Sequence, residues 1–319
     1  MKFKLDFSPP SSDHKIDLKD KIYLIGSCFS DQIGDKLSEN KFNVLSNPFG
    51  TIYNPHSIFK LLKGELNENQ ITKSQEVFYH WDTQGDIFGI DKAEVQASLK
   101  ERLERSNKTI KGSNFLFITL GTAWVYILND SSEIVANCHK QPSSHFQKRL
   151  LSTEEITEDF KELHQYLSTI NPEINIVFTV SPVRHVKDGL VENNRSKSIL
   201  IESVHLLCET YKNVSYFPSY EIMIDELRDY RFFKEDLIHP SDEAVHYIWD
   251  QFTKSFFSTE SLEFLIRWQK LNSALSHRPL HPSSASHQKF LKQTLQKLED
   301  LNDSVDLSAE INSIKTKLS

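Results

Sequence analysis

Two stretches of this chain carry residue types that could together transfer an acyl group. The first is Gly26-Ser27-Cys28, which follows the apolar run at residues 22–25 and precedes a segment whose apolar residues recur every fourth position, as on one face of a helix. A hydroxyl at the first turn of a helix lies beside unpaired backbone N–H groups and the positive end of the helix dipole. We therefore expect Ser27 to be a nucleophile whose own N–H helps to hold the oxyanion, with simple helix capping as the structural alternative.

The second stretch is Asp236-Leu237-Ile238-His239-Pro240, far along the chain from the first. A carboxylate three residues before a histidine can accept a hydrogen bond from one ring nitrogen and leave the other nitrogen to take a proton. We expect His239 to be the general base for Ser27 and Asp236 to orient it. The alternative is that Asp236 caps the following helix and His239 is an ordinary loop residue.

Two rival chemistries use other residues. Cys28 is a rival nucleophile, because a thiol at a helix N-terminus is acidified. Metal-assisted hydrolysis would need His139, His185 and His239 to converge from three strand-end loops. No pair of these histidines has a short ligand spacing, and no carboxylate lies beside the first two in the sequence. We therefore expect neither a metal nor a cofactor.

Six motifs of this chain resemble those of the GSCFA-domain proteins, which are similar to the SGNH or GDSL-like hydrolase superfamily. The set spans about residues 20–260. The resemblance implies an SGNH-type fold, a triad of Ser27, His239 and Asp236, and an oxyanion-donating backbone N–H at Gly50. In chain order the motifs are Gly26-Ser27-Cys28-Phe29-Ser30, Asn47-Pro48-Phe49-Gly50-Thr51-Ile52-Tyr53-Asn54-Pro55, Thr119-Leu120-Gly121-Thr122-Ala123-Trp124, Asn137-Cys138-His139-Lys140, Ser181-Pro182-Val183-Arg184-His185 and Asp236-Leu237-Ile238-His239-Pro240.

One position departs from the superfamily pattern. SGNH enzymes usually carry Gly-x-Asn after the third strand, where the Asn amide completes the oxyanion hole, whereas residues 121–123 here are Gly-Thr-Ala. Losing one such donor typically costs about 3 kcal/mol of transition-state stabilisation. We expect Asn137 to supply the missing donor, with Asn54, Trp124 and Thr122 as alternatives.

Basic residues near two strand ends form a candidate substrate-binding rim. Arg184 and His185 follow a predicted buried strand, and with Lys140 they could hold a carboxylate or phosphate of the substrate. Ion pairs with acidic residues of the same loop are the alternative. Further candidate substrate-binding residues lie in the loops of the motifs above: Asn54, Trp124 and His139.

The totals exclude several classes of protein. A chain of 319 residues with 38% hydrophobic residues can form one large globular domain with an appendage. The formal net charge of −7 argues against nucleic acid as a main partner. No apolar run approaches a membrane span, nothing at the amino end resembles an export signal, and the three cysteines are too few for a disulfide framework. We therefore expect a cytoplasmic protein without a membrane or nucleic-acid partner.

Apolar strand patterns alternate with amphipathic helix patterns from residue 21 onward. This alternation predicts an α/β fold in which helices cover both faces of a central parallel sheet, a three-layer α/β/α sandwich of flavodoxin-like type. We expect a lead-in at residues 1–20, a GSCFA or SGNH-like hydrolase domain at 21–260 and a helical extension at 261–319, through which the chain could form a homo-oligomer.

The expected function is ester hydrolysis or O-acyl transfer, with a small-molecule ester or an acylated carbohydrate as substrate. The alternative is a non-catalytic protein that binds a carbohydrate or a partner on the same fold. The missing Asn after Gly121 is the feature of the sequence that favours this alternative.

Overall fold

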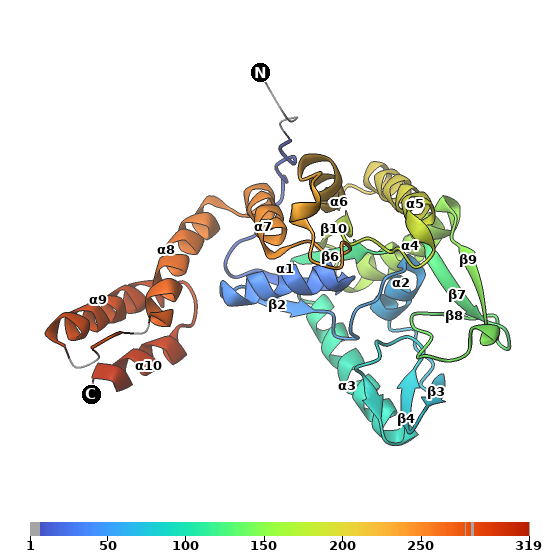
Figure 1. Cartoon of the computed structure of the whole chain (residues 1–319), viewed down its shortest axis with the longest axis horizontal. Coiled ribbons are helices and arrows are strands. Elements are labelled where there is room, and N and C mark those ends of the chain that lie inside the picture. The colour runs from blue at the N-terminus through green and yellow to red at the C-terminus, as the bar shows by residue number, and fades with distance from the viewer. Residues whose placement is uncertain (1–6, 278, 282–283, 319) are drawn as a thin grey trace.

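The structure is a computed structural model that describes residues 7–277, 279–281 and 284–318. Its centre is a sheet of five parallel strands, β1 Lys21–Gly26, β2 Asn43–Ser46, β6 Phe115–Leu120, β10 Asn175–Val180 and β11 Val214–Tyr216. Their order across the sheet is β11-β10-β6-β1-β2 (Figure 1). The central strands are largely apolar runs, as strands that are covered on both faces require.

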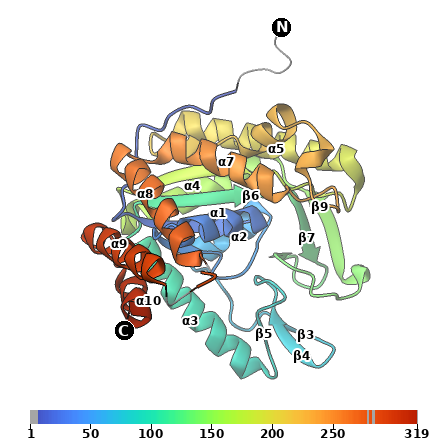
Figure 2. The same cartoon turned by 60° about the vertical axis from the view of Figure 1, so that its left-hand side comes forward.

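Helices cover both faces of this sheet, so the predicted three-layer fold is confirmed (Figures 1 and 2). Side chains alternate along β1, with Tyr23 and Ile25 in one apolar cluster and Ile22 and Leu24 in the other. The helices α1 Cys28–Glu39 and α7 Asp242–Phe256 pack on the second of these faces. The first face is covered by α2 Pro55–Lys63, α3 Lys92–Ile110, α4 Thr153–Ile170 and α5 Gly189–Thr210.

Two small antiparallel sheets interrupt this pattern. The first contains β3 Ile71–Ser74, β4 Val77–His80 and β5 Phe88–Gly89, and the second contains β7 Trp124–Leu128, β8 Ile134–Val135 and β9 Phe146–Leu150. Strand β9 pairs along the whole of β7, although its own sequence is half polar. The short helix α6 Ser219–Glu221 follows β11 and continues into a π-helical turn.

The C-terminal helices form an apolar cluster of their own beside the sheet (Figure 1). They are α8 Thr259–Ser276, α9 Ala285–Leu301 and α10 Ser308–Leu318. Leu291 and Leu298 of α9 are buried in this cluster with Trp268 of α8. The Trp268 indole N–H also donates to the carbonyl of Glu39 at the end of α1, at 2.8 Å, and so attaches the extension to the main domain. Within the described residues, every helix is too short or too polar to cross a lipid bilayer.

Gly26 makes the turn from β1 into α1. Its φ of 138° is accessible to glycine but strained for residues with a Cβ. A Cβ built there would lie 2.1 Å from the carbonyl oxygen of Thr119 on β6. Glycine therefore lets the end of β1 approach β6 closely enough to place Ser27 at the edge of the sheet.

Replacing Gly26 with alanine should lower the free energy of unfolding by roughly 3 kcal/mol, because backbone strain and a backbone clash add. Chemical denaturation of the purified variant measures this. Gly85→Ala is the matched control, since an added Cβ at Gly85 meets no heavy atom within 4 Å. A Gly26→Ala protein as stable as the control would contradict the turn described above.

Candidate active site

Ser27 lies directly after β1, at the edge where the carboxyl ends of the parallel strands meet. It is buried, with 1% of its surface exposed. Its hydroxyl oxygen accepts a hydrogen bond from the N–H of Phe29 at 3.3 Å and so caps α1. The same hydroxyl donates to the hydroxyl of Ser181, which follows β10, at 2.9 Å. Ser27 is therefore a helix cap whose proton is directed toward a second strand end.

Asn47, which follows β2, fixes the backbone around Ser27. Its side-chain oxygen accepts a hydrogen bond from the N–H of Gly26 at 2.8 Å. Its amide nitrogen donates to the carbonyl of Ser27 at 3.4 Å and to Asp31 at 2.8 Å. Asn47 has a φ of 40°, a conformation that asparagine adopts more readily than most residues. The turn that carries Ser27 is thus held by the end of the neighbouring strand β2.

Asp236 and His239 form a hydrogen-bonded pair in the loop before α7. Nδ1 of His239 lies 2.6 Å from Oδ2 of Asp236. The backbone N–H groups of Ile238 and His239 donate to the other carboxylate oxygen at 2.8 and 2.9 Å. The backbone N–H of His239 and then its ring lower the pKa of Asp236 to about 2, so the carboxylate is ionised at neutral pH. This carboxylate fixes the tautomer of His239 that leaves Nε2 free to accept a proton.

Arg184 connects this loop to the loop that follows β10. Its guanidinium donates to the carbonyl of Leu237 at 3.0 Å, and its backbone N–H donates to the carbonyl of Ile238 at 3.3 Å. The guanidinium also lies 4.0 Å from the ring centroid of Phe233. The sequence suggested that Arg184 binds an anionic substrate group, whereas in the structure its guanidinium bonds the carbonyl beside the Asp236–His239 pair.

The loop at residues 181–184 is thereby shared by both halves of the predicted triad. Ser181 at its start holds the hydroxyl of Ser27, and Arg184 at its end holds the loop of His239. Among the described residues, no hydrogen bond joins Ser27 to His239. Asp236 and His239 are hydrogen-bonded to each other, and the hydroxyl of Ser27 faces Ser181 instead of the imidazole.

The backbone groups expected to hold an oxyanion are already hydrogen-bonded. The N–H of Ser27 donates to the carbonyl of Thr119 at 3.1 Å, and the N–H of Gly50 donates to the carbonyl of Asn47 at 2.8 Å. The side-chain oxygen of Asn137 accepts a hydrogen bond from the N–H of His139 at 2.8 Å, within a local turn. The N–H groups of Ser27 and Gly50 would have to share or exchange their present partners to bind an oxyanion.

Two other predicted residues have structural partners, and a third is buried. Asn54 caps α2 by accepting a hydrogen bond from the N–H of Ser57 at 2.8 Å. The indole N–H of Trp124 donates to the carbonyl of Glu192 at 3.4 Å. Burial lowers the pKa of His185, whose Nδ1 is buried without a hydrogen-bond partner in the part of the chain that the structure describes.

His139 lies in the insert formed by the small sheets, against Tyr79 and Trp81. Its ring stacks on Tyr79 with centroids 4.6 Å apart, and Nε2 donates to the carbonyl of His80 at 2.8 Å. Burial lowers the pKa of His139 to about 4, so its ring is neutral at pH 7. No three His, Cys, Asp or Glu side chains of the described residues cluster as metal ligands. The convergence required for metal-assisted hydrolysis is therefore not found among them.

Two family models cover most of the chain. Residues 21–252 match the model of the GSCFA family, and residues 268–319 match that of the GSCFA domain protein, C-terminal domain. The chain belongs to the GSCFA family. The family resemblance read from the sequence motifs is thus confirmed. No curated protein matches this GSCFA sequence closely enough to count as a relative.

Several solved esterase structures are similar to this family member at low identity. A mutant acetyl esterase with a bound acetate ion aligns at 7% identity and a TM-score of 0.36, covering 79% of this chain and 99% of its own. A carbohydrate esterase family 3 protein from Talaromyces cellulolyticus aligns at 7% identity and a TM-score of 0.34, covering 79% of this chain and 99% of its own. An acetyl xylan esterase from the rumen bacterium Butyrivibrio proteoclasticus aligns at 9% identity and a TM-score of 0.38, covering 81% of this chain and 67% of its own. Similarities at these TM-scores do not define the activity of this chain.

Sequence reasoning assigned no role in the site to three residues near this edge of the sheet: Asn47 and Ser181, which begin two of the motifs, and Lys197. The amine of Lys197 on α5 donates to the carbonyl of Ser181 at 2.7 Å and is 1% exposed. A signal was present in the sequence, because Lys197 falls on the same helix face as the buried Leu200 and Val204. A lysine on the apolar face of a helix indicates either a buried charge or a specific partner.

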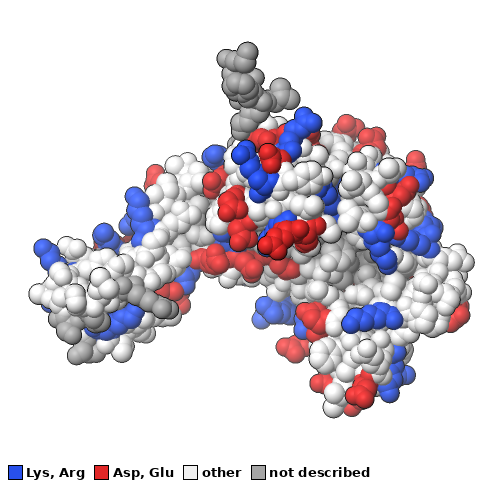
Figure 3. Space-filling view, viewed as in Figure 1, with Lys and Arg blue, Asp and Glu red and all other residues white. Residues whose placement is uncertain are grey.

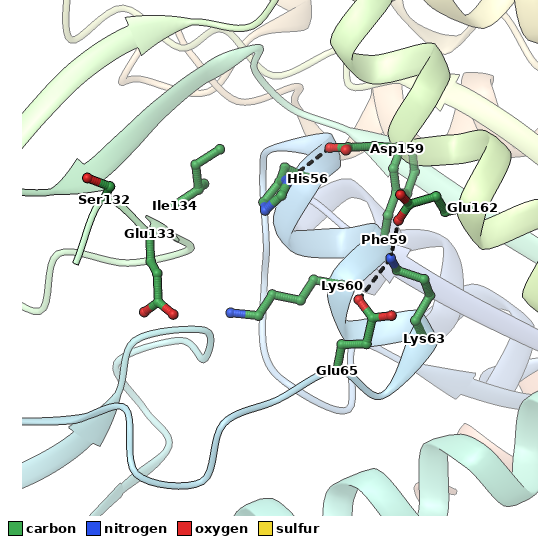
Figure 4. Close-up of a pocket in the computed structure, with 10 residues that line it drawn as sticks. All are labelled: His56, Phe59, Lys60, Lys63, Glu65, Ser132, Glu133, Ile134, Asp159 and Glu162. Atoms are coloured by element: carbon green, nitrogen blue, oxygen red, sulfur yellow. Dashed lines mark hydrogen bonds and ion pairs between the residues drawn. The ribbon is translucent and has the colours of Figure 1, made fainter.

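A polar pocket of about 420 Å³ lies away from Ser27, between α2, α4 and the turn after β7 (Figure 4). His56 is hydrogen-bonded to Asp159 at 2.7 Å, and both lysines of the pocket are paired with carboxylates. Neither Ser27 nor the Asp236–His239 pair lines this pocket. Since both lysines are paired with carboxylates, the pocket offers an anionic ligand no free lysine.

Acidic side chains gather over α1 and α7 on the face seen in Figure 3. A wide surface depression beside Asp236 is also mostly acidic, and one basic residue is among the residues that line it. A ligand that enters beside His239 therefore meets mainly negative charge, which disfavours anionic ligands. The residues that line the depression are Lys234, Glu235, Asp236, Ser241, Asp242 and Glu243.

Proposed function

We propose that this GSCFA protein is a serine hydrolase that cleaves ester bonds, with Ser27 as nucleophile, His239 as general base and Asp236 as the group that orients it. The observation that carries the proposal is the 2.6 Å hydrogen bond between Asp236 and His239, in a loop that Arg184 attaches to the strand end next to Ser27. Burial raises the pKa of the Cys28 thiol, with the charge of Asp31 as a second cause, which favours the serine hydroxyl over the thiol as nucleophile.

In the proposed acylation step, the hydroxyl of Ser27 rotates from Ser181 to Nε2 of His239. Ser27 Oγ attacks the ester carbonyl carbon while its proton passes to His239. The bond between the carbonyl carbon and the alcohol oxygen then breaks, and the alcohol leaves with the proton from His239. The product is an acyl group bound to Ser27.

Deacylation repeats these steps with water. Water gives a proton to His239 and attacks the acyl carbon, and the proton then returns to Ser27 Oγ as the acid leaves. If a sugar hydroxyl enters in place of water, the same steps give O-acyl transfer. Since the depression beside Asp236 is mostly acidic, we propose neutral esters, including acetylated carbohydrates, as the substrate class.

Labelling with a fluorophosphonate probe tests the proposal, because the probe bonds covalently to an activated serine hydroxyl. We expect the label on Ser27, located by mass spectrometry of peptides, and turnover of p-nitrophenyl acetate. A panel of longer acyl chains then measures the size of the acyl site. A wild-type protein that stays unlabelled and turns over no ester of the panel would sink the proposal.

Arg184→Ala should lower kcat by about 10- to 100-fold, because small displacements of a catalytic group cost factors of this size. Arg184 holds the carbonyl of Leu237 beside the Asp236–His239 pair. Steady-state kinetics with p-nitrophenyl acetate measures the loss. Arg228→Ala is a control of the same residue type outside this loop, and equal kinetics in the two variants would refute the positioning role.

A second candidate function is ligand binding without catalysis. The hydrogen bonds that occupy the N–H groups of Ser27 and Gly50 favour it, since a catalytic oxyanion hole needs donors aimed at the developing charge. This candidate predicts no probe labelling and saturable carbohydrate binding that Ser27→Ala leaves unchanged. Calorimetric titration with acetylated oligosaccharides distinguishes it from the esterase.

A further inference from the structure

Lys197 is a buried cation with few partners. It is 1% exposed, and its amine donates one hydrogen bond, to the carbonyl of Ser181 at 2.7 Å. In the described part of the chain, no carboxylate forms an ion pair with it. Burying an ammonium group without an opposite charge is unfavourable, and an apolar side chain of similar size is usually more stable in such a place. The structure therefore retains a residue that fold stability alone does not explain.

The surroundings of Lys197 place it behind Ser181, the residue that bonds the proposed nucleophile. Ser181, whose carbonyl holds the amine, also holds the hydroxyl of Ser27 through its own side chain at 2.9 Å. The titratable groups that interact with Lys197 come from three elements: Cys28 on α1, His185 in the loop after β10, and Tyr220 on α6, whose ring centroid is 5.6 Å from the amine. None of these groups is an anion at neutral pH that could neutralise it.

We propose that Lys197 supplies the positive charge that stabilises the oxyanion formed when Ser27 attacks an ester carbonyl. The proposal rests on the esterase function proposed above. It accounts for a gap in the site, since the N–H groups of Ser27 and Gly50 are bonded to backbone carbonyls and the hydroxyl of Thr122 is bonded to Ser196 at 3.0 Å. A charge in a dry interior acts over a longer range than a hydrogen-bond donor, so Lys197 need not touch the substrate to stabilise the anion.

The titration of Lys197 agrees with this role. Burial lowers the pKa of its amine to about 7, and the smaller effect of Cys28 acts in the opposite direction. A new negative charge on the oxygen bound to Ser27 would favour the protonated amine and raise this pKa. Lys197 would therefore gain its full charge when the tetrahedral intermediate forms.

A boronic acid distinguishes this role from a structural one. Its trigonal boron is neutral, and when Ser27 Oγ bonds to it, the hydroxyl proton passes to His239 and the boron becomes a tetrahedral anion. Methylboronic acid thus measures affinity for an anionic adduct, whereas KM for p-nitrophenyl acetate reports largely on a neutral substrate. Lys197→Met removes the charge and keeps a side chain of similar length.

We expect Lys197→Met to lower kcat and the affinity for methylboronic acid by about 100-fold each, the effect of losing one oxyanion-stabilising group. KM should change by less than about threefold, because the neutral ester does not need the charge. The midpoint of thermal unfolding should rise, because the buried ammonium is removed. Lys60→Met is the matched contrast: Lys60 is paired with the buried Asp82, so its loss should lower the midpoint.

The outcomes separate this proposal from the esterase function. Wild-type kcat and boronate affinity in Lys197→Met would overturn the role of Lys197 while the esterase stands. A Lys197→Met protein that unfolds at a lower temperature, with a higher KM and a lower kcat, would show that Lys197 has a structural role. This outcome would also overturn the proposed role of Lys197. If the wild type neither binds the boronic acid nor hydrolyses any ester in a Ser27-dependent way, the esterase function itself fails, and this proposal with it.

Discussion

Replacing Ser27 with alanine is expected to lower kcat for p-nitrophenyl acetate by about 10⁴-fold or more, as the loss of a catalytic nucleophile does in other serine hydrolases. The hydroxyl oxygen of Ser27 is the atom that would bond the acyl group, and Ser27 is the residue that directly follows β1. KM should change little, since the hydroxyl contributes little to ground-state binding. Stopped-flow or steady-state assays, with active-site titration to determine the concentration of active enzyme, measure the difference in kcat.

The substitution also removes a helix cap, so its effect on folding must be measured separately. Ser27 accepts the hydrogen bond of the Phe29 N–H, and replacing such a cap with alanine costs about 1 kcal/mol of stability. Thermal unfolding of Ser27→Ala and Ser27→Gly separates the two effects, since glycine at a cap costs only a few tenths. Cys28→Ala is the neighbouring control and should retain activity. If Cys28→Ala abolishes turnover and Ser27→Ala spares it, the nucleophile is the thiol.

Asp236→Asn should lower kcat by about 10³- to 10⁴-fold, because the amide no longer selects the imidazole tautomer whose Nε2 can accept a proton. The structure gives the carboxylate two backbone donors besides the ring of His239, at 2.8 and 2.9 Å. The oxygen of an Asn side chain can still accept from both of these N–H groups, which leaves its NH₂ group facing Nδ1 of His239 and favours the tautomer in which Nε2 carries the proton. Kinetics at fixed pH, with circular dichroism as a folding control, measure the loss.

The pH dependence of this carboxylate follows from its lowered pKa of about 2. A carboxyl group with a depressed folded-state pKa stabilises the native loop at pH values above its ordinary pKa, and this contribution is lost only as the pH falls through about 2. Asp236 should therefore stay ionised throughout the range from pH 4 to pH 8. Carbon NMR titration of the carboxyl group measures its pKa directly.

His239→Ala provides the control for that titration. The backbone N–H of residue 239 is the largest cause of the shift and remains in the variant, whereas the ring is lost. The midpoint of Asp236 should consequently rise only part of the way toward its ordinary value. A midpoint near the ordinary value in the wild-type protein would contradict the hydrogen bonds described for this loop.

The main sheet and its helices could be predicted from the sequence because their signals are local. The runs at β1, β6 and β10 are too apolar to be anything but covered strands, and the helices α1 and α4 carry regular apolar stripes. Strand β9 could not be found in this way, since it is half polar and forms only because β7 offers it an edge. Helix α5 begins at Gly189, whereas its apolar face begins only at Leu200.

The contacts of the candidate site also divide into those that the local sequence determines and those that depend on tertiary packing. The hydrogen bond between Asp236 and His239 spans three residues, so the turn itself determines it. The hydrogen bond between Ser27 and Ser181 spans 154 residues and exists because β1 and β10 both pair with β6. No property of the residues near Ser181 reveals such a contact in the sequence.

The sequence by itself determined the family, the layered α/β architecture and the loop that pairs Asp236 with His239, because each depends on residue types at short, fixed spacings. The tertiary structure alone decided which groups surround Ser27, namely Asn47 at its backbone, Ser181 at its hydroxyl and, behind Ser181, the amine of Lys197. These contacts depend on the order of strands in the sheet and on which helix face is buried, and both are outcomes of packing the whole chain into one core.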